Sequence, residues 1–293
     1  LAQEQSLPLW LSRGLFQWCG PDQAERVARA FNQVPPLDLR VNRLRSTPDR
    51  AAALFAERGI ATAPIADCRD GLQVLEPSGD LRRWPGFSEG YWCVQDRAAQ
   101  WVTPLLDPSP GQRVLDACAA PGGKATHLAE LMGDEGEIWA VDRSPGRLQR
   151  VAANAARLGC SSIQALASDA SQLAQERPEW SGRFDRILVD APCSGLGTLA
   201  RHPDARWRVT EESVADLLKL QIELLNGLRS LLAPGGRLVY ATCTIHPSEN
   251  TEQIHSWLQA HPDLVLNSEQ QRWPDPSGGD GFYAAVITAP AAA

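Results

Sequence analysis

An α/β fold with a parallel sheet is predicted for the larger part of this chain. From about residue 110, short β-rich segments alternate with longer helical segments, and this alternation gives a parallel sheet that helices cover on both faces. A glycine-rich turn and several aspartates follow the β-rich segments, as in open α/β sheets that bind ligands. The expected strands are Arg113–Ala117, Ile138–Asp142, Ile163–Ala167, Arg186–Asp190, Arg237–Thr242 and a last strand at Gly281–Thr288.

Helical periodicity fills the stretches between these strands. It predicts helices at Ala125–Met132 and Arg147–Leu158, and a long helix from about Glu211 to Leu232. Pro234, Gly235 and Gly236 are expected to end the long helix.

The first hundred residues have a different pattern, which predicts a small α+β domain. The Pro-rich stretch Leu105–Gly111 is expected to join it to the larger unit, giving domains at 1–104 and 105–293. The helices expected in the small domain are Ala24–Phe31 and Ala51–Arg58, and its strands are Leu37–Asn42, Leu72–Leu75 and Tyr91–Gln95.

Composition limits the classes of protein that this chain can represent. It has 293 residues, of which 43% are hydrophobic, and no run of about 18 apolar residues, so no membrane association is expected. Seven cysteines without a CxxC pair predict neither a disulfide framework nor a metal site, and favour a cytoplasmic location. The protein is expected to be a monomer. Since residue 1 is Leu and Met132 is the only methionine, we expect the trimmed end of a longer protein.

The expected strand ending at Ala117 is followed by a glycine-rich loop, Cys118-Ala119-Ala120-Pro121-Gly122-Gly123-Lys124, and then by a helix. Such a turn lets the backbone approach a ligand closely and directs helix N–H groups toward it. The spacing differs from GxGxxG, so a dinucleotide is not the first expectation. A tight turn without a ligand remains the alternative.

Three aspartates extend this pattern along the same edge of the sheet. Asp142 ends one expected strand, Asp169 follows the next, and Asp190 ends the one after that. Each aspartate taken alone is explained as well by a helix cap. Together with the glycine loop they favour a ligand site, and carboxylates suit the ribose hydroxyls and charged tail of an amino-acid-bearing adenosine better than a pyrophosphate.

Two cysteines are expected at this edge as well. Cys193 lies in Asp190-Ala-Pro-Cys-Ser-Gly, and Cys243 lies in Tyr240-Ala-Thr-Cys, followed by Pro247-Ser-Glu-Asn250. An isolated buried cysteine usually serves only as a small apolar side chain. Here both follow strands that point toward the predicted ligand site.

Taken together, CAAPGGK, DAPCSG, RHPD at 201–204, ATC and PSEN resemble the Nol/Nop/Sun RNA cytosine-5 methyltransferases, and most of all the bacterial Sun (RsmB-type) small-subunit rRNA methyltransferases. LRVN at 39–42 and VQD at 94–96 extend the resemblance over most of the chain. It implies a Rossmann-like methyltransferase domain after the small α+β domain, and an enzyme that forms 5-methylcytidine in 16S rRNA. The full-length Sun members also carry a helical NusB-like domain before this region.

The resemblance also implies roles for individual residues. Residues Cys118 to Lys124, Asp142, Asp169 and Asp190 would hold S-adenosylmethionine. Cys243 would be the nucleophile that adds to cytosine C6, Cys193 would help release the product, and Asp190 would bind the edge of the base. The base that removes the C5 proton is not identified from the sequence. Candidate RNA contacts are Arg40, Arg43, Arg45, Arg82, Arg83 and Arg201.

Three other functions are compatible with parts of this pattern. A tRNA or large-subunit rRNA cytosine-5 methyltransferase would share every motif. A dinucleotide-dependent oxidoreductase is disfavoured by the missing GxGxxG, and an inactive RNA-binding relative by the intact Cys193, Asp190 and Cys243. The net charge of −7 does not exclude nucleic acid, because a local basic face is sufficient.

Overall fold

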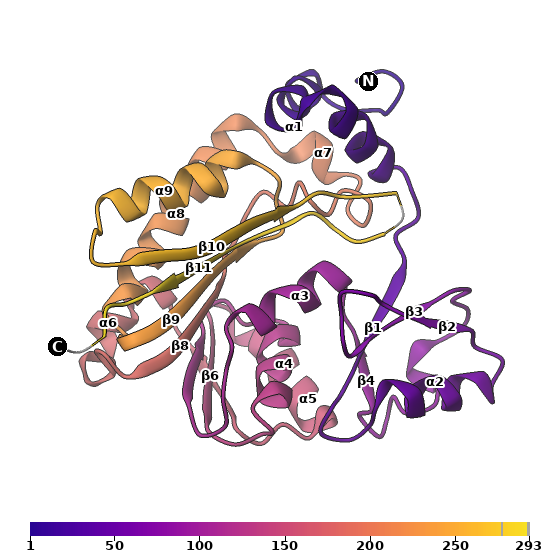
Figure 1. Ribbon diagram of the computed structural model, residues 1–293, viewed down its shortest axis with the longest axis horizontal. Coiled ribbons are helices and arrows are strands. Elements are labelled where there is room, and N and C mark those ends of the chain that lie inside the picture. Colours follow the sequence, from indigo (N-terminus) through magenta and orange to yellow (C-terminus); the bar gives the residue numbers. More distant parts are fainter. Residues whose placement is uncertain (277, 292–293) are drawn as a thin grey trace.

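The computed structural model of the protein describes residues 1–276 and 278–291. Its larger sheet has seven strands (Figure 1): β5 (Arg113–Asp116), β6 (Glu137–Asp142), β7 (Ile163–Ala167), β8 (Phe184–Asp190), β9 (Leu232–Thr242), β10 (Val265–Arg272) and β11 (Phe282–Thr288). They lie in the order β10-β11-β9-β8-β5-β6-β7. The first five of these strands in sequence are parallel; β11 pairs antiparallel with β9, and β10 pairs antiparallel with β11 at the edge. The predicted fold class is confirmed.

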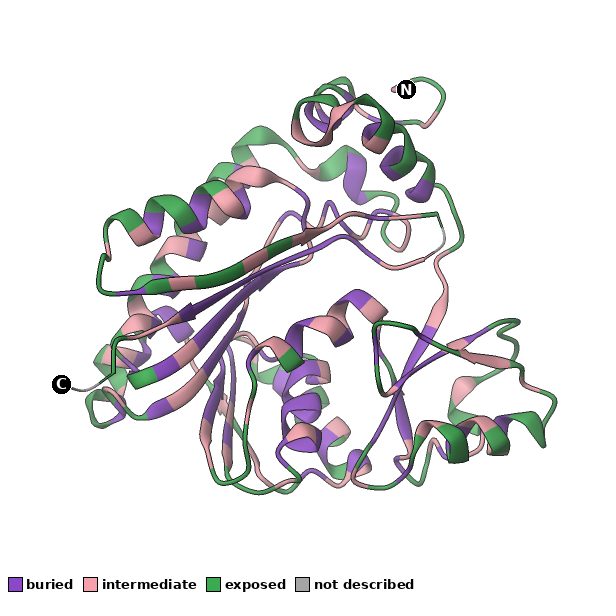
Figure 2. Ribbon diagram, in the orientation of Figure 1, coloured by how far each residue is buried: buried purple, intermediate pink, exposed green. Residues whose placement is uncertain are grey.

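Helices cover both faces of this sheet (Figure 1). On one face lie α3 (Arg97–Leu105), α4 (Gly123–Leu131) and α5 (Pro145–Leu158). On the other lie α6 (Leu173–Glu176), α8 (Glu211–Arg229) and α9 (Thr251–Gln259). Figure 2 shows that the central strands are buried along most of their length. Burial on both faces explains the nearly continuous apolar character of these strands.

The chain reverses its direction of travel across the sheet between β5 and β8. After β5 it continues outward through β6 and β7, and it then returns to place β8 on the other side of β5. The loops that follow β5 and β8 therefore separate from each other at the carboxyl edge. In open α/β sheets this is the position at which a ligand crevice forms.

The small unit has a four-stranded antiparallel sheet in the order β2-β3-β1-β4. Helix α2 (Pro48–Ala56) packs against it through Phe55, which contacts the rings of Trp84 and Trp92. This arrangement confirms the expected α+β character. The strands are β1 (Leu37–Val41), β2 (Thr62–Pro64), β3 (Gly71–Val74) and β4 (Trp92–Val94), and a short 3-10 turn, η1, spans Leu81–Arg83.

Two helices from the first part of the chain pack against the larger unit. Helix α1 (Leu9–Ala30) contains a kink at Gly20, where φ is +76°, and buries its apolar side against Leu196, Leu199 and Ile245. Helix α3 shares a core cluster with residues of β5, α4 and β11. The predicted boundary at residue 104 lies inside α3, and the division into domains stays a prediction.

The other short helical segments are η2 (Ala170–Gln172), η3 (Pro178–Trp180), α7 (Ala205–Arg208) and η4 (Pro247–Glu249). Along residues 1–276 and 278–291, none of the helices combines the length and the apolar character needed to cross a membrane.

The predicted end of the long helix is wrong by three residues. Helix α8 stops at Arg229, and β9 begins at Leu232 with a pairing to Phe184. The register then shifts, so that Arg186 pairs with Arg237. The segment Pro234–Gly236 is therefore accommodated as an irregularity inside the strand, where Gly235 has φ +71°.

Candidate active site

A cavity of about 450 Å³ opens at the carboxyl edge of the sheet, between the loops that follow β5 and β8. This volume lies in the range of pockets that hold small molecules and cofactors. The lining residues are Ala117, Cys118, Ala120, Asp142, Arg143, Ser144, Arg147, Asp169, Ala170, Asp190, Ala191, Pro192, Cys193, Leu220, Leu224, Cys243 and Phe282.

The glycine loop forms one wall of this cavity through Cys118 and Ala120. Gly122 has φ +103°, a conformation that favours glycine, and a Cβ atom there would lie a tight 3.0 Å from the backbone of Val151 in α5. The loop then enters α4 at Gly123. The other predicted residues of this loop, Ala119, Pro121, Gly122, Gly123 and Lys124, support this wall without lining the cavity.

Asp142 and Asp169 also line the cavity. Asp142 is buried at the end of β6, where its Oδ1 accepts a hydrogen bond from the backbone N–H of Ser144 at 2.9 Å. Its Oδ2 accepts from Ala120 N–H at 3.3 Å, which ties it to the glycine loop. Asp169 caps η2 by accepting from Ser171. Both aspartates therefore act as local caps and also face the cavity.

Asp190 at the end of β8 is held by Lys124, whose Nζ lies 2.7 Å from its Oδ2. Burial acts to lower the pKa of Lys124, but the Asp190 carboxylate outweighs this and raises it. The ammonium group also lies 5.1 Å from the centre of the Phe282 ring. Lys124 therefore stays charged and fixes the orientation of the Asp190 carboxylate.

The two cysteines meet at the same cavity. Their Sγ atoms are 3.4 Å apart, although 50 residues separate them in the chain. The hydrogen bond with Cys243 and burial together raise the pKa of Cys193 well above its ordinary value. Cys193 is therefore a neutral thiol at physiological pH and can donate a proton to its neighbour.

Residues of PSEN hold the loops that carry both cysteines. Glu249 is fully buried and accepts hydrogen bonds from the N–H of Ser194 at 2.9 Å and from its hydroxyl at 2.5 Å. Asn250 accepts from Thr242 at 2.6 Å and donates to the carbonyl of Thr244 at 3.0 Å, on either side of Cys243. PSEN contributes to the family resemblance, but this supporting role was not predicted from the sequence.

Close backbone contact completes this arrangement. The N–H of Gly197 donates to the carbonyl of Cys243 at 3.0 Å, and a Cβ atom at Gly197 would lie 2.1 Å from the carbonyl oxygen of Gly281. Only glycine fits here.

Several cavity residues were not predicted. Arg143, Ser144 and Arg147 follow Asp142 directly, so their nearness to a predicted site residue was an available signal. Leu220 and Leu224 come from α8 and Phe282 from β11, and nothing in their local sequence indicates that they meet this edge.

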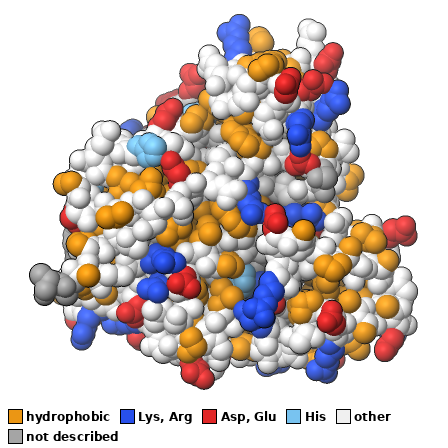
Figure 3. All heavy atoms as spheres, in the orientation of Figure 1, with side chains coloured by type: hydrophobic (Ala, Val, Ile, Leu, Met, Phe, Trp, Pro, Cys, Tyr) orange, Lys and Arg blue, Asp and Glu red, His pale blue; other side chains and the backbone are white. Residues whose placement is uncertain are grey.

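The predicted RNA contact at Arg40 is wrong. Its side chain is fully buried because it pairs with Glu130 of α4. Arg201 is 28% exposed and forms ion pairs with Asp96 and Asp280, at 2.7 and 2.9 Å. Arg43, Arg45, Arg82 and Arg83 are exposed and stay candidates. On the face drawn in Figure 3, Lys and Arg side chains are interspersed with Asp and Glu.

Asp116 gives a testable pH dependence. It is fully buried, and neither carboxylate oxygen has a hydrogen-bond partner among the described residues. Burial, with a contribution from Asp190, raises its pKa to about 7. Between about pH 4 and about pH 7 the folded protein thus retains a proton that the unfolded chain releases, so the stability contribution of this group falls as pH rises.

We expect Asp116→Asn to remove this loss. Relative to wild type, the free energy of unfolding of the variant should increase between about pH 5 and about pH 8, by up to roughly 4 kcal/mol. Thermal unfolding without ligand should show this as a melting temperature that rises relative to wild type over the same pH range. Asp22→Asn, at an exposed aspartate, is the control. A difference that does not change with pH would contradict the assignment.

Comparisons with known proteins identify the family of this chain. Residues 103–288 match the family model described as 16S rRNA methyltransferase RsmB/F, and residues 7–80 match the ferredoxin-like domain of RsmF/B-like methyltransferases. A probable ribosomal RNA small subunit methyltransferase B from Synechocystis sp. is 45% identical over 95% of this chain and 61% of its own length. A ribosomal RNA small subunit methyltransferase B from Serratia proteamaculans is 42% identical over 96% of this chain and 66% of its own length.

A solved structure shares the fold. The crystal structure of a methyltransferase homologue from Pyrococcus horikoshii has a TM-score of 0.86 and 27% identity, covering 98% of this chain and 97% of the other. The chain spans about two thirds or less of the two curated relatives described above. On the match of the family model to more than half of its residues, the chain belongs to the 16S rRNA methyltransferase RsmB/F family.

Proposed function

We propose that this protein is an S-adenosylmethionine-dependent RNA methyltransferase that forms 5-methylcytidine in 16S rRNA. The observation that carries the proposal is the pair of cysteine sulfurs, 3.4 Å apart, beside Asp190 in the cavity. The names of the bacterial relatives support rRNA of the small subunit as the substrate.

The cavity suits S-adenosylmethionine. Asp142 and Asp169 offer carboxylate oxygens to ribose hydroxyls and to the amine of the adenine, while Leu220 and Leu224 offer apolar surface. The glycine loop permits close approach of the ligand to the backbone between Cys118 and Ala120. The bound cofactor supplies an electrophilic methyl group.

The chemistry assigned to the chain begins with Cys243. Cytosine C5 is a weak nucleophile. Cys243 first gives its thiol proton to solvent, and addition of the resulting thiolate to C6 shifts the electrons of the C5–C6 double bond to C5, which then accepts the methyl group. Asp190, fixed by Lys124, accepts a hydrogen bond from the N4 amino group of the base and so orients the base in the site.

Product release requires that the C5 proton leave. Water is the proposed acceptor of this proton. The electrons of the C5–H bond restore the C5–C6 double bond, and the C6–S bond breaks toward Cys243. Its sulfur then receives a proton from the neutral thiol of Cys193, which lies within hydrogen-bond distance. Cys193 recovers its proton from solvent.

A base in a duplex stack cannot reach this cavity, so the target cytosine must be unpaired or extruded. The same geometry fits a tRNA or large-subunit rRNA cytosine. Bisulfite sequencing of total RNA from cells with and without the gene distinguishes these substrates. We expect one 16S rRNA cytosine to lose its protection in cells without the gene. Loss only in tRNA or 23S rRNA would overturn the assigned substrate, and no loss would overturn the activity.

Asp142→Ala should weaken cofactor binding. Loss of a charged acceptor removes roughly 1.5–3 kcal/mol, which is about one to two decades in the dissociation constant for S-adenosylmethionine measured by calorimetry. Asp134→Ala is the matched control, because Asp134 also accepts backbone hydrogen bonds, from Ser161 and Ser162, but does not line the cavity. Equal affinity of Asp142→Ala and wild type would show that Asp142 acts only as a cap.

A further inference from the structure

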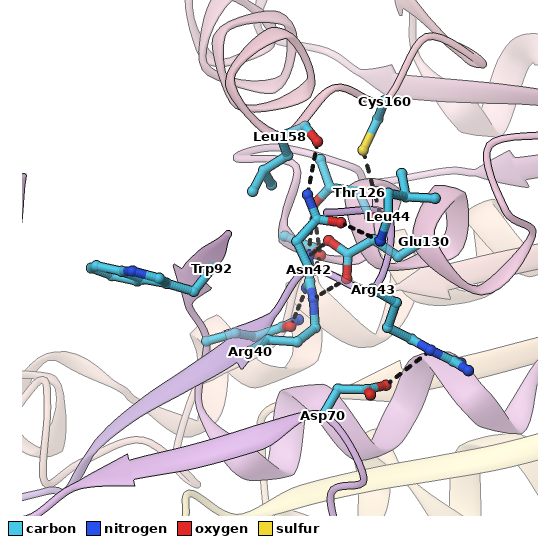
Figure 4. Close-up of polar contacts among 12 residues, drawn as sticks. Arg40, Asn42, Arg43, Leu44, Asp70, Trp92, Thr126, Glu130, Leu158 and Cys160 are labelled. Atoms are coloured by element: carbon cyan, nitrogen blue, oxygen red, sulfur yellow. Dashed lines mark hydrogen bonds and ion pairs between the residues drawn. The ribbon is translucent and has the colours of Figure 1, made fainter. Parts of the chain in front are cut away.

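The side chain of Arg40 joins the small unit to α4. It extends from β1 and is fully buried, and its Nε and Nη2 donate to the two carboxylate oxygens of Glu130 at 3.0 and 2.8 Å (Figure 4). Nη2 also donates to the hydroxyl of Thr126 at 3.0 Å. Nη1 donates to the backbone carbonyl of Gly123 at 2.7 Å and to the side-chain oxygen of Gln95.

Gly123 belongs to the glycine loop. The hydroxyl of Thr126, which Arg40 also contacts, lies 2.9 Å from the carbonyl oxygen of Gly122 and 3.2 Å from that of Gly123. The guanidinium group thus engages the first turn of α4 both directly and through Thr126. Lys124, which follows Gly123 in the chain, carries the ammonium group that orients Asp190.

These contacts exceed what a buried ion pair requires. Pairing with Glu130 alone would neutralise the charge of Arg40. The further donors reach a backbone carbonyl and two uncharged side chains, and only the planar, five-donor guanidinium can span all of them at once. A lysine could reach one or two of these acceptors, but it could not span the whole set.

We propose that Arg40 is a positioning residue for the cofactor loop: its hydrogen bond to the carbonyl of Gly123 fixes the backbone of the loop, and so makes the small unit part of the cofactor site. The identity of the ligand in this inference rests on the proposed function. The ordering of the loop in the unliganded protein does not rest on the proposed function, because it depends only on contacts within the chain.

Arg157 provides a matched comparison at the same junction. Its Nη1 donates to the carbonyls of Phe87 and Trp92 at 2.9 and 3.1 Å. It thereby joins α5 to the small unit through a guanidinium group, as Arg40 joins α4. It has no hydrogen bond to the glycine loop among the described residues, and it does not line the cavity.

The experiment compares Arg40→Lys with Arg157→Lys. Calorimetry gives the dissociation constant for S-adenosylmethionine, and hydrogen exchange of the unliganded protein follows the peptide that covers residues 122–130. We expect Arg40→Lys to raise the dissociation constant about tenfold and to accelerate exchange at the start of α4. Arg157→Lys should change neither quantity, even where the melting temperature falls.

A folded Arg40→Lys variant with wild-type affinity and wild-type exchange at residues 122–130 would overturn the inference. If Arg40→Lys does not fold, the double variant Arg40→Met/Glu130→Met replaces the buried pair with apolar side chains. The affinity for S-adenosylmethionine and the exchange at residues 122–130 are then measured on this variant, and wild-type values of both would overturn the inference. Wild-type protein that binds no S-adenosylmethionine would overturn the proposed function instead. The exchange measurement would then still decide whether Arg40 orders the loop.

Discussion

Cys243→Ala should abolish methyl transfer and leave cofactor binding nearly unchanged. The sulfur of Cys243 acts on the base in the proposed reaction, whereas the cofactor depends on Asp142, Asp169 and the glycine loop. Removal of a nucleophile costs on the order of 10³-fold or more in turnover. We expect this loss in a radiolabelled methyl-transfer assay, together with a dissociation constant for S-adenosylmethionine within about threefold of wild type.

Cys160→Ala is the control for this substitution. Cys160 is buried and does not line the cavity, so its variant should keep its turnover. Activity of Cys243→Ala within about tenfold of wild type would exclude Cys243 as the nucleophile.

Cys193→Ala should trap the enzyme on its RNA. Cys243 and the cofactor site remain, so the adduct forms and receives the methyl group. The proton donor beside the Cys243 sulfur is missing, so the C6–S bond breaks slowly. We expect a covalent complex of protein and methylated RNA, visible as a slowly migrating band on a denaturing gel.

The double variant Cys193→Ala/Cys243→Ala should give no such band, because no bond to C6 can form. If Cys193 were only a small apolar side chain, its replacement would lower the stability modestly and trap nothing. A trapped band from Cys243→Ala alone would show that the roles of the two cysteines are reversed.

The placement of the cavity residues followed from the sequence because it depends on a general property of parallel sheets. Strands of this kind all end at one edge, so the positions of Asp142, Asp169 and Asp190 after successive strands predicted that they would lie near one another. The same reasoning placed Cys193 and Cys243 together. Their catalytic roles stay predictions, which the variants above test.

Features that depend on distant partners were not predictable in this way. Arg40 has the same local sequence signals as an exposed arginine, and its burial depends on Glu130, 90 residues away. Strand β10 was missed because it is an exposed edge strand with the polar sequence NSEQQR (Figure 2), which lacks the apolar alternation of a half-buried strand. Pro234–Gly236 has the signature of a turn, yet the pairing of β8 with β9 continues around it.

The buried carboxylate of Glu249 has a consequence for how the site opens. It binds Ser194, whose hydroxyl lies 2.7 Å from that of Thr244, so the residue after Cys193 is joined both to Glu249 and to the residue after Cys243. Local unfolding that frees the loop at Ser194 leaves the buried carboxylate of Glu249 with unsatisfied hydrogen-bond acceptors, which costs free energy. The two loops therefore belong to one cooperative unit of local unfolding, and the spacing of the sulfurs persists until that unit opens as a whole.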